Sequence, residues 1–318
     1  MAATSQSVAA VLSPLKGRDY LSSADFNSAE TSALLALSRQ LKAGERRIDL
    51  GNRVLGLIFT KASTRTRVSF VSAIARLGGQ TVDLNPQVTQ LGRGEPLEDT
   101  ARVLSRFCDV LAIRTYAQQE LVDYSNWASI PVLNALTDLE HPCQALADYL
   151  TLQESFGDLQ GQTLAYVGDG NNVAHSLMLC GAMLGVNVRI GCPSGFEPLP
   201  EVVAKASALA IGGATVEVIS DPVAAVRGAQ AIYTDVWASM GQEQEQTQRA
   251  QAFQGFCVNE DLVAEADPSA IVLHCLPAHR GEEISAAVME GKASRVFDQA
   301  ENRLHVQQAL LAVVMGGL

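Results

Sequence analysis

The feature of this sequence that most restricts its fold is an alternation of short apolar runs with longer helical patterns. The runs that have the length and composition of strands are residues 54–59, 110–113, 163–167, 186–190, 215–219, 231–233 and 271–273. Helical patterns lie between them, for example at residues 68–77, 145–156 and 172–184. Strands that alternate with helices in this way form parallel sheets covered by helices. The sequence therefore predicts an α/β protein.

The length of the chain and one uninterrupted helical stretch indicate how the domains are divided. The chain has 318 residues, and because domains usually contain roughly 100–200 residues, we expect two of them. Neither Pro nor Gly occurs between Pro142 and Gly157, so this stretch reads as one helix that connects the domains. We place the first domain at residues 1–155 and the second at residues 156–301. The last helix, from about residue 302, has an apolar side that it must bury against one of the two.

Composition and charge exclude several classes of protein. The net charge is −11, which opposes binding to nucleic acid or to an anionic membrane surface. No apolar run approaches the ~18–20 residues that span a bilayer, and the first basic residue is Lys16, so the N-terminus resembles neither a secretory signal nor an Arg-rich transit sequence. The six cysteines are widely spaced without a CxxC motif, which favours reduced thiols. We expect a cytoplasmic protein that holds any anionic substrate through local positive groups.

A cluster of hydroxyl and guanidinium groups follows the first predicted strand. Residues 63–67 read Ser-Thr-Arg-Thr-Arg and stand between that strand and a predicted helix. Free backbone N–H groups at the start of a helix suit a phosphate, and the hydroxyls of Ser63, Thr64 and Thr66 add further donors. Arg65 can pair bidentately with phosphate oxygens. The alternative is an N-capped surface helix with solvated arginines, but the cluster favours an anion site, although not a P-loop, whose GxxxxGK[ST] pattern is absent.

A second group of polar residues surrounds His141. His141 and Gln144 stand at the start of a predicted helix, where Pro142 suits the first turn. An imidazole there can donate to a carbonyl oxygen or an oxyanion. Arg114 follows the predicted strand at residues 110–113, and the carboxyl end of a strand is where α/β sheets bind ligands. The alternatives are a structural histidine and a solvated arginine.

The turn at residues 168–172, Gly-Asp-Gly-Asn-Asn, half resembles a dinucleotide fingerprint. It makes an NAD-dependent dehydrogenase the natural rival hypothesis. Two features disfavour that rival: Val173 replaces the third glycine, and the strand at residues 186–190 ends in Gly-Cys-Pro, without an acid for the ribose. The two glycines then serve a tight turn, and the two asparagines supply polar contacts.

Two more polar segments follow predicted strands in the second half of the chain. Asp235 follows the strand at residues 231–233, and residues 274–281 follow the strand at residues 271–273. Cys275 is a nucleophile if a base activates it, but a small packing residue is the commoner use of cysteine. His274, Cys275 and His279 are weaker candidates for metal ligands, because a second cluster of ligands is missing.

These segments together resemble the transcarbamylase family. The Ser-Thr-Arg-Thr-Arg and His-Pro-x-Gln segments mark the family in general, and Ser-Met-Gly and His-Cys-Leu-Pro mark its ornithine branch. No position in these motifs departs from the family pattern, and the resemblance extends from about residue 17 to the C-terminus. The motifs that carry it are residues 59–70, 90–95, 141–144, 168–172, 235–241, 274–281 and 300–303.

The resemblance implies a fold and an assembly. It implies two α/β domains, each a parallel sheet flanked by helices, with the active site in the interdomain cleft. The first domain would bind carbamoyl phosphate and the second L-ornithine, and residues 302–318 would return to the first domain. The resemblance also implies a homotrimer, and neither a metal nor an organic cofactor.

The resemblance further implies roles for individual residues. The residues that would bind carbamoyl phosphate are Ser63, Thr64, Arg65, Thr66, Arg114, His141 and Gln144. The point where the two substrates meet would be lined by Cys275, Leu276 and Arg303. Gln90 is similar to a residue that reaches carbamoyl phosphate from a neighbouring subunit. Ornithine falls to Asn172, Asp235, Ser239 and Met240. Catalysis falls to Arg65, Arg114, His141 and Cys275.

The implied reaction transfers the carbamoyl group to the side-chain amine of ornithine, giving citrulline and phosphate, with arginine biosynthesis as the expected role. Cys275 would orient the amine without forming a covalent bond. Aspartate, putrescine and N-acetylornithine are alternative second substrates, but Asp235 disfavours an acidic substrate and suits a free α-amino group. A non-catalytic relative that only binds anions is a further alternative.

Overall fold

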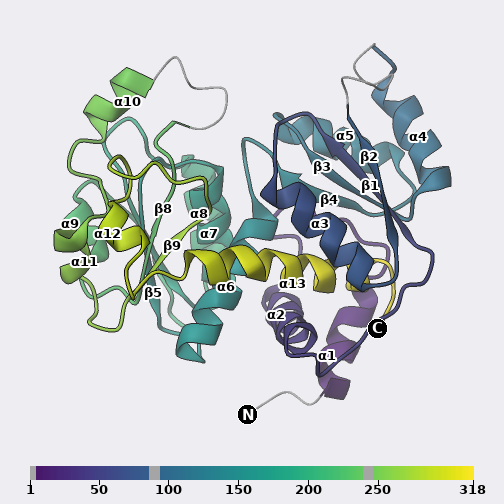
Figure 1. The fold of residues 1–318 in the computed structure, drawn as a ribbon, viewed down its shortest axis with the longest axis horizontal. Helices are drawn as coiled ribbons and strands as arrows, with labels where there is room; N and C mark the ends of the chain where they lie inside the picture. The colour runs from purple at the N-terminus through teal and green to yellow at the C-terminus, as the bar shows by residue number, and fades with distance from the viewer. Residues whose placement is uncertain (1–4, 86–93, 239–245) are drawn as a thin grey trace. The chain divides into compact units, whose positions relative to one another are not determined.

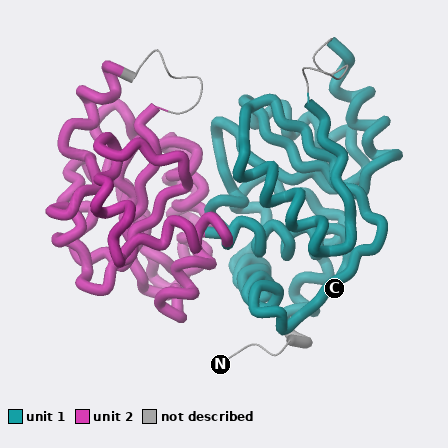
Figure 2. Tube along the Cα trace, in the orientation of Figure 1, with its two compact units in different colours: residues 1–147, 302–318 teal, residues 148–301 magenta. Residues whose placement is uncertain are grey.

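A computed structural model describes residues 5–85, 94–238 and 246–318 of the chain (Figure 1). The chain divides into two compact units, one of residues 1–147 with 302–318 and one of residues 148–301 (Figure 2). The division falls within helix α6 (Pro142–Phe156), and the predicted boundary at residue 155 lies near the end of this same helix. Among the described residues, none of the helices combines the length and the apolar character that crossing a membrane requires.

The first unit is built on a parallel sheet of four strands in the order β2-β1-β3-β4. The central strands are buried along almost their whole length, as is expected where helices cover both faces of a parallel sheet. The edge strand β2 is more exposed and has a polar sequence. The strands are β1 (Val54–Phe59), β2 (Gln80–Leu84), β3 (Val110–Arg114) and β4 (Val132–Leu136).

Helices of the first unit begin at positions that the sequence marks. At the start of α2, the Asn27 side chain accepts a hydrogen bond from the Glu30 amide, and the Glu30 carboxylate accepts one from the Asn27 amide. This reciprocal capping box satisfies two amides that a helix start leaves without partners. The helical elements are α1 (Ser5–Leu12), η1 (Ser13–Leu15), α2 (Ser28–Lys42), α3 (Arg65–Arg76), α4 (Leu97–Phe107), α5 (Gln118–Trp127), the start of α6 and most of α13 (Val296–Val314).

The second unit is built on a parallel sheet of five strands in the order β7-β6-β5-β8-β9. The strands are β5 (Thr163–Val167), β6 (Asn187–Gly191), β7 (Val216–Ile219), β8 (Ala231–Thr234) and β9 (Ile271–His274). Besides the end of α6 and the start of α13, its helices are α7 (Asn172–Met183), α8 (Pro200–Leu209), α9 (Pro222–Val226), α10 (Gln246–Ala252), α11 (Glu260–Ala264) and α12 (Ala286–Met289).

Both faces of the second sheet are covered (Figure 1). Side chains alternate along each strand, so Ala165 and Val167 of β5 face one way and Tyr166 faces the other. The first face packs on α9, α11 and α12 through a cluster that includes Val226, Leu262 and Val288. Strands that are buried on both faces must be apolar throughout, which explains the continuous apolar runs of the sequence.

Each sheet contains one point where the chain reverses its direction of strand addition. In the first unit, β2 lies on one side of β1, whereas β3 and β4 lie on the other. In the second, β6 and β7 lie on one side of β5, whereas β8 and β9 lie on the other. The loops after the two central strands diverge there, which opens a crevice for ligands at the carboxyl ends of the strands. The β1/β3 and β5/β8 pairs are therefore the places at which to look for binding residues.

The predicted fold class is confirmed, and the differences lie at its edges. Strands β2 and β4 were not among the predicted runs, because β2 reads Gln-Thr-Val-Asp-Leu and β4 contains Asn134, so neither is a purely apolar run. The last helix begins at Val296, earlier than predicted, because the stretch before residue 302 is more polar. Residues 242–251 are polar and rich in glutamine, which predicts a loop or an exposed helix. From Gln246 onward they form α10, and residues 242–245 lie outside the described part.

The close packing of α7 leads to a prediction about stability. A Cβ atom at Gly181 would lie 2.1 Å from the hydroxyl oxygen of Tyr149, which is fully buried and donates to the Leu177 carbonyl at 2.6 Å. We expect Gly181→Ala to displace this ring and to destabilise the fold by roughly 1–3 kcal/mol, although alanine favours a helix by about 1 kcal/mol. Thermal unfolding should show a lower midpoint. Ser207→Ala, on the exposed surface of α8, is the control, and an unchanged midpoint for Gly181→Ala would show that the Tyr149 ring has room to move.

Candidate functional site

The turn between β1 and α3 leaves the start of the helix open to a ligand. Thr64 occupies the N-cap position, yet its side chain makes no capping hydrogen bond. The first helical bond runs from the Val68 amide to the Thr64 carbonyl, so the amides of residues 65–67 precede the helical ladder. Amides and hydroxyls at the positive end of a helix favour a phosphate. Ser63, Thr64 and Arg65 lie on this turn and are at least partly exposed, as an anion site requires.

Arg303 of α13 connects this turn to α6 within the first unit. One terminal nitrogen of its guanidinium donates to the Gln144 side-chain oxygen at 2.7 Å, and the other donates to the Thr66 hydroxyl at 2.7 Å. All three side chains are buried. Both acceptors are neutral, so these two bonds orient the guanidinium without cancelling its charge. An arginine keeps its charge at any ordinary pH, so the site is electropositive.

His141 and Arg114 complete the cluster. Arg114 is the last residue of β3, and its carbonyl accepts hydrogen bonds from the amide and the hydroxyl of Thr60 at 2.9 and 3.1 Å, which joins the ends of β1 and β3. His141 is buried, and its burial lowers the pKa of the imidazole well below 6.5, with further lowering by the charges of Arg303, Arg114 and Arg65. A neutral imidazole among three guanidinium groups can donate to an oxygen while the arginines hold a dianion.

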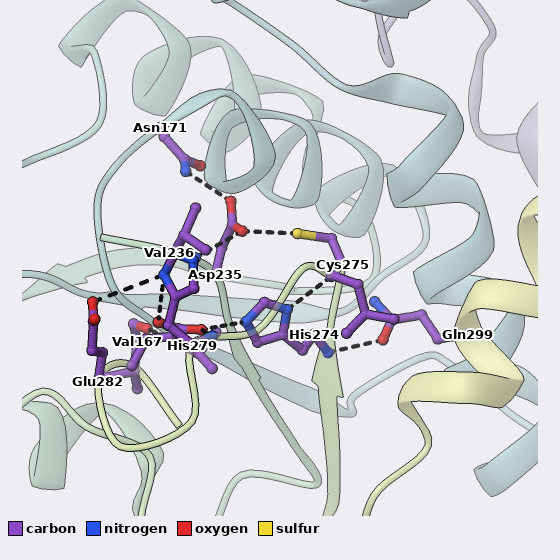
Figure 3. Close-up of polar contacts among 12 residues, drawn as sticks. Val167, Asn171, Asp235, Val236, His274, Cys275, His279, Glu282 and Gln299 are labelled. Atoms are coloured by element: carbon purple, nitrogen blue, oxygen red, sulfur yellow. Dashed lines mark hydrogen bonds and ion pairs between the residues drawn. The ribbon is translucent and has the colours of Figure 1, made fainter. Parts of the chain in front are cut away.

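In the second unit, the buried carboxylate of Asp235 stands just after β8 (Figure 3). One of its oxygens accepts a hydrogen bond from the Asn171 amide group at 3.0 Å, and the other accepts from the Cys275 thiol at 2.9 Å. Asn171 also caps α7, because its side-chain oxygen accepts from the Val173 amide at 2.9 Å. Three different strand ends therefore meet at this carboxylate. A buried carboxylate at a switch point is suited to bind a cationic group.

The chemistry of Cys275 follows from this contact. Burial raises the pKa of its thiol well above 9.0, and the charge of Asp235 and its hydrogen bond raise it further. A thiol that stays protonated is a poor nucleophile, because the thiolate is the reactive species. The geometry therefore favours Cys275 as a hydrogen-bonding residue and disfavours it as a covalent catalyst.

A buried pair, His274 and Glu283, holds the loop that carries Cys275. The Nδ1 atom of His274 accepts a hydrogen bond from the Leu276 amide at 2.8 Å, so its Nε2 carries the hydrogen that faces Glu283 at 3.1 Å. Leu276 has a φ of 61°, in the left-handed region that costs a non-glycine residue roughly 1 kcal/mol. The bond to His274 stabilises this backbone conformation and so fixes the direction of the neighbouring thiol.

Two groups of potential metal ligands occur among the described residues, namely Asp235 with His274 and Cys275, and His279 with Glu282 and Glu283. In the first group, both ring nitrogens of His274 are engaged by Leu276 and Glu283. In the second group, one oxygen of Glu283 is already held by His274 and by the His279 amide. These hydrogen bonds favour a structural role for both groups.

The turn after β5 also bears on the dehydrogenase hypothesis. In a dinucleotide fold, the second glycine of the turn lets a pyrophosphate approach the backbone. At Gly170 a Cβ atom would lie 2.2 Å from the nitrogen of Pro198 and 2.5 Å from the carbonyl carbon of Glu197. The chain's own backbone therefore occupies the space that the glycine leaves, which disfavours a pyrophosphate there.

The structure places most of the residues proposed from the sequence on these two switch points. In the first unit it brings together the turn residues Ser63, Thr64, Arg65 and Thr66 with Arg114, His141, Gln144 and Arg303. In the second it brings together Asp235 and Cys275, with Asn172 and Leu276 next to residues of the same network. Gln90, Ser239 and Met240 lie outside the described residues.

Sequence reasoning missed several residues of the second network. Asn171 was noted only as one of two polar residues, yet it bonds Asp235. Its position just before a helix is the signal that could have identified it as a cap. Glu283 and Gln299 also escaped notice, although the Gln299 side-chain oxygen accepts a hydrogen bond from the His274 amide at 2.9 Å. No local pattern marks these two, because separations of 9 and 25 residues from His274 match no helix or strand repeat.

The environment of His141 predicts a pH dependence of stability. Unfolded His141 takes up a proton below about pH 6.5, whereas folded His141 stays neutral to a much lower pH. Protonation then favours the unfolded chain, so the wild type should lose stability relative to His141→Gln by up to about 1.4 kcal/mol per pH unit below 6.5. Chemical unfolding from pH 8 to pH 5 would measure this difference. If the free energies of unfolding of the two proteins change with pH in the same way, His141 is not held neutral in the folded protein.

The Asp235–Cys275 bond predicts the reactivity of the thiol. Asp235→Asn removes a charge that raises the pKa of Cys275, so more thiolate should form, and alkylation of Cys275 near pH 8 should become about tenfold faster. Peptide mass spectrometry after timed iodoacetamide treatment would measure the rate. Cys257 is the control in the same samples, because its rate should not change. Equal rates at Cys275 in both proteins would contradict the bond.

Comparison with known proteins agrees with both halves of this description. Residues 18–154 match the carbamoyl-phosphate-binding domain of the aspartate/ornithine carbamoyltransferases, and residues 160–314 match the Asp/Orn-binding domain of the same family. The ornithine carbamoyltransferase of Prochlorococcus marinus (strain MIT 9313) is 80% identical over 318 residues, which is 100% of each chain. That of Thermosynechococcus vestitus is 61% identical over 305 residues, covering 96% of this chain and 98% of the relative.

Solved structures give the same result. The ornithine carbamoyltransferase of Gloeobacter violaceus is 54% identical, with a TM-score of 0.87 over 94% of this chain and 99% of that one. The enzyme of Pyrococcus furiosus is 49% identical, with a TM-score of 0.91 over 96% of this chain and 99% of that one. Since sequence, fold and the order of the two domains all agree, this chain belongs to the aspartate/ornithine carbamoyltransferase family.

Proposed function

We propose that this chain is an ornithine carbamoyltransferase, which transfers the carbamoyl group of carbamoyl phosphate to the side-chain amine of L-ornithine and releases L-citrulline and phosphate in arginine biosynthesis. Within this family, the observation that supports ornithine as the second substrate is the buried Asp235 carboxylate, bonded to Asn171 and Cys275. Aspartate would bring a second anion to this group, whereas ornithine brings a cation. The relatives named above are also called ornithine carbamoyltransferases.

The first unit supplies the groups that carbamoyl phosphate needs. Its phosphate is proposed to bind the amides of the turn after β1, and its charge is balanced by Arg65 and Arg114. Thr66, Arg114 and His141 then donate to the carbonyl oxygen, where negative charge grows during attack. Removing one such donor typically costs ~10²–10³ in rate. The proposed contacts are Ser63, Thr64, Arg65, Thr66, Arg114, His141 and Gln144, with Cys275, Leu276 and Arg303 at the carbonyl end.

The second unit supplies the groups that ornithine needs. Asp235 is proposed to hold the α-amino group, and Asn172 with Ser239 and Met240 to hold the α-carboxylate. Cys275 orients the attacking amine through hydrogen bonding, which agrees with the raised pKa of its thiol. Holding both reactants in place can itself supply a large part of the rate enhancement.

The proposed chemistry is a direct transfer. The side-chain amine of ornithine resembles that of lysine, with a pKa near ~10.4, and only its neutral form attacks. The amine first attacks the carbonyl carbon and forms the new C–N bond, and the C–O bond to phosphate then breaks. The departing phosphate accepts the proton that the amine loses. The leaving group is already activated, so the proposal calls for neither a metal nor an organic cofactor. Catalysis rests on placement and electrostatic stabilisation.

The assembly is also a proposal. We infer a cytoplasmic homotrimer in which Gln90 of one chain reaches the carbamoyl phosphate site of its neighbour. The resemblance of residues 90–95 to the family motif supports this inference. In the described part of the first unit, apolar side chains such as Val68, Val103 and Phe107 are exposed, as expected of a surface that a second chain covers.

The proposed function predicts a specific pattern of substrate use. Purified protein should form a ureido product and phosphate from carbamoyl phosphate with ornithine, but not with putrescine, N-acetylornithine or aspartate. Asp235→Asn should reduce kcat/KM for ornithine by roughly 10²-fold or more, because it removes the charge that holds the α-amino group. Colorimetric assay of the ureido group would measure both. Product with another amine alone would overturn the assignment of ornithine, and no product at all would favour a non-catalytic relative.

A further inference from the structure

We propose that Arg249 is a positioning residue for the second substrate, because it clamps together the two loops that carry Asn171 and Asp235. This inference rests on the proposed function and extends it to a residue that does not itself need to touch ornithine. Arg249 lies on the short helix α10 of the second unit (Figure 1). It is 93% buried, with 7% of its surface exposed.

The clamp is formed by a single nitrogen of the Arg249 side chain. Its Nη1 atom donates to the Asp169 carboxylate at 2.7 Å and to the Trp237 carbonyl at 2.9 Å. A terminal guanidinium nitrogen carries two hydrogens, so each can serve one of these acceptors. Asp169 belongs to the turn after β5, and Trp237 belongs to the loop after β8. Arg249 thus joins the two loops on either side of the switch point of this sheet.

These bonds close a ring that contains Asp235, the carboxylate that is proposed to bind the amino group of the substrate. Asp235 is bonded to the Asn171 side chain at 3.0 Å, and the Asn171 amide donates to the Asp169 carbonyl at 2.7 Å. Asp169 is bonded to Arg249 and Arg249 to Trp237, and Val236 alone separates Trp237 from Asp235 in the chain. Closed networks of this kind hold each member more firmly than isolated bonds do. Removing Arg249 breaks the connection between Asp169 and Trp237 and leaves the bond between Asn171 and Asp235 as the remaining link between the two loops in this ring.

Aromatic packing keeps the guanidinium in place. Its central carbon lies 5.1 Å from the centre of the Phe196 ring, at a distance suited to a cation–π contact. Phe196 also holds the β5 turn directly, because its carbonyl accepts a hydrogen bond from the Gly170 amide at 2.8 Å. Phe253 packs edge-on against Phe196 and stacks on Trp237. The same aromatic group therefore supports both loops that Arg249 joins.

The charge of Arg249 has a second consequence for a cationic substrate. Asp169 and Asp235 are both buried acids at the same end of the sheet. The ion pair with Arg249 neutralises Asp169, which leaves Asp235 as the acid that attracts the amino group. Without Arg249, the charge of Asp169 would compete for that group and would repel the charge of Asp235. Both effects act on ornithine, and neither acts on carbamoyl phosphate.

The test is a double-mutant cycle in the full-length protein with Arg249→Gln, Asp169→Asn and the combination of both. We expect Arg249→Gln to raise KM for ornithine about tenfold or more while KM for carbamoyl phosphate stays within about twofold. The two substitutions break the same bond, and Asp169→Asn also removes the acid that Arg249→Gln leaves unpaired, so the double variant should be no worse than Arg249→Gln alone. Arg249→Lys should recover part of the loss, because it keeps the charge but loses the planar fork.

A matched control is available in the same unit. Arg189 of β6 also donates to a backbone carbonyl, that of Arg227 at 2.9 Å, but it is not part of the ring. Arg189→Gln should leave both KM values within about twofold of the wild type. If Arg249→Gln changes both KM values equally, or lowers the unfolding temperature without changing KM for ornithine, the proposal is wrong. Additive effects in the cycle would also overturn it.

A second readout does not depend on turnover. Hydrogen exchange should become about tenfold faster in peptides that cover residues 166–171 and 231–238 of Arg249→Gln, with little change in peptides from the first unit. Faster exchange confined to α10 would overturn the clamp. If Arg249→Gln does not fold, Asp169→Asn carries the same test. An inactive wild-type protein would refute the proposed function, whereas the exchange pattern would still decide whether Arg249 joins the two loops.

Discussion

The backbone hydrogen bonds between parallel strands are the constraint on which the rest of this structure depends. Parallel strands cannot be joined by tight turns, so every connection must cross over through a helix or a long segment. The ends of the strands and the starts of the helices that follow then gather at one edge of each sheet. Thr64 before α3 and Asn171 before α7 occupy equivalent places in the two units. Polar side chains lie there because the strands are buried on both faces, whereas the loops that follow them are not.

The two units use this shared architecture for opposite charges. In the first, burial lowers the pKa of the His141 imidazole, and the charges of Arg303, Arg114 and Arg65 lower it further. In the second, burial raises the pKa of the Cys275 thiol, and the charge of the Asp235 carboxylate raises it further. A phosphate dianion requires a positively charged site, and an amino group requires a negatively charged one. The net charge of −11 makes the local arginine cluster the decisive feature for binding an anion.

The fold class and the strand-end motifs were predictable because both depend on local patterns. A strand buried on both faces must be apolar, and a phosphate site at a helix start needs small hydroxyl residues next to an arginine. Asn171, Glu283 and Arg249 were not predictable in their roles. Asn171 and Arg249 bond Asp235 and Asp169, which are 64 and 80 residues away in the sequence, and Glu283 bonds His274, which is 9 residues away across a loop. No spacing rule connects such pairs until the order of the strands is known.

The sequence by itself determined the alternation of strands and helices, the two halves of the chain and the residue types available at each strand end. Hydrophobic periodicity and helix-start chemistry are properties of short segments, so they can be read without the fold. Only the tertiary structure decided that Arg303 bonds Thr66 and Gln144, and that Cys275 donates to Asp235. Those contacts depend on strand order and on the path of the last helix, which the packing of the whole chain sets.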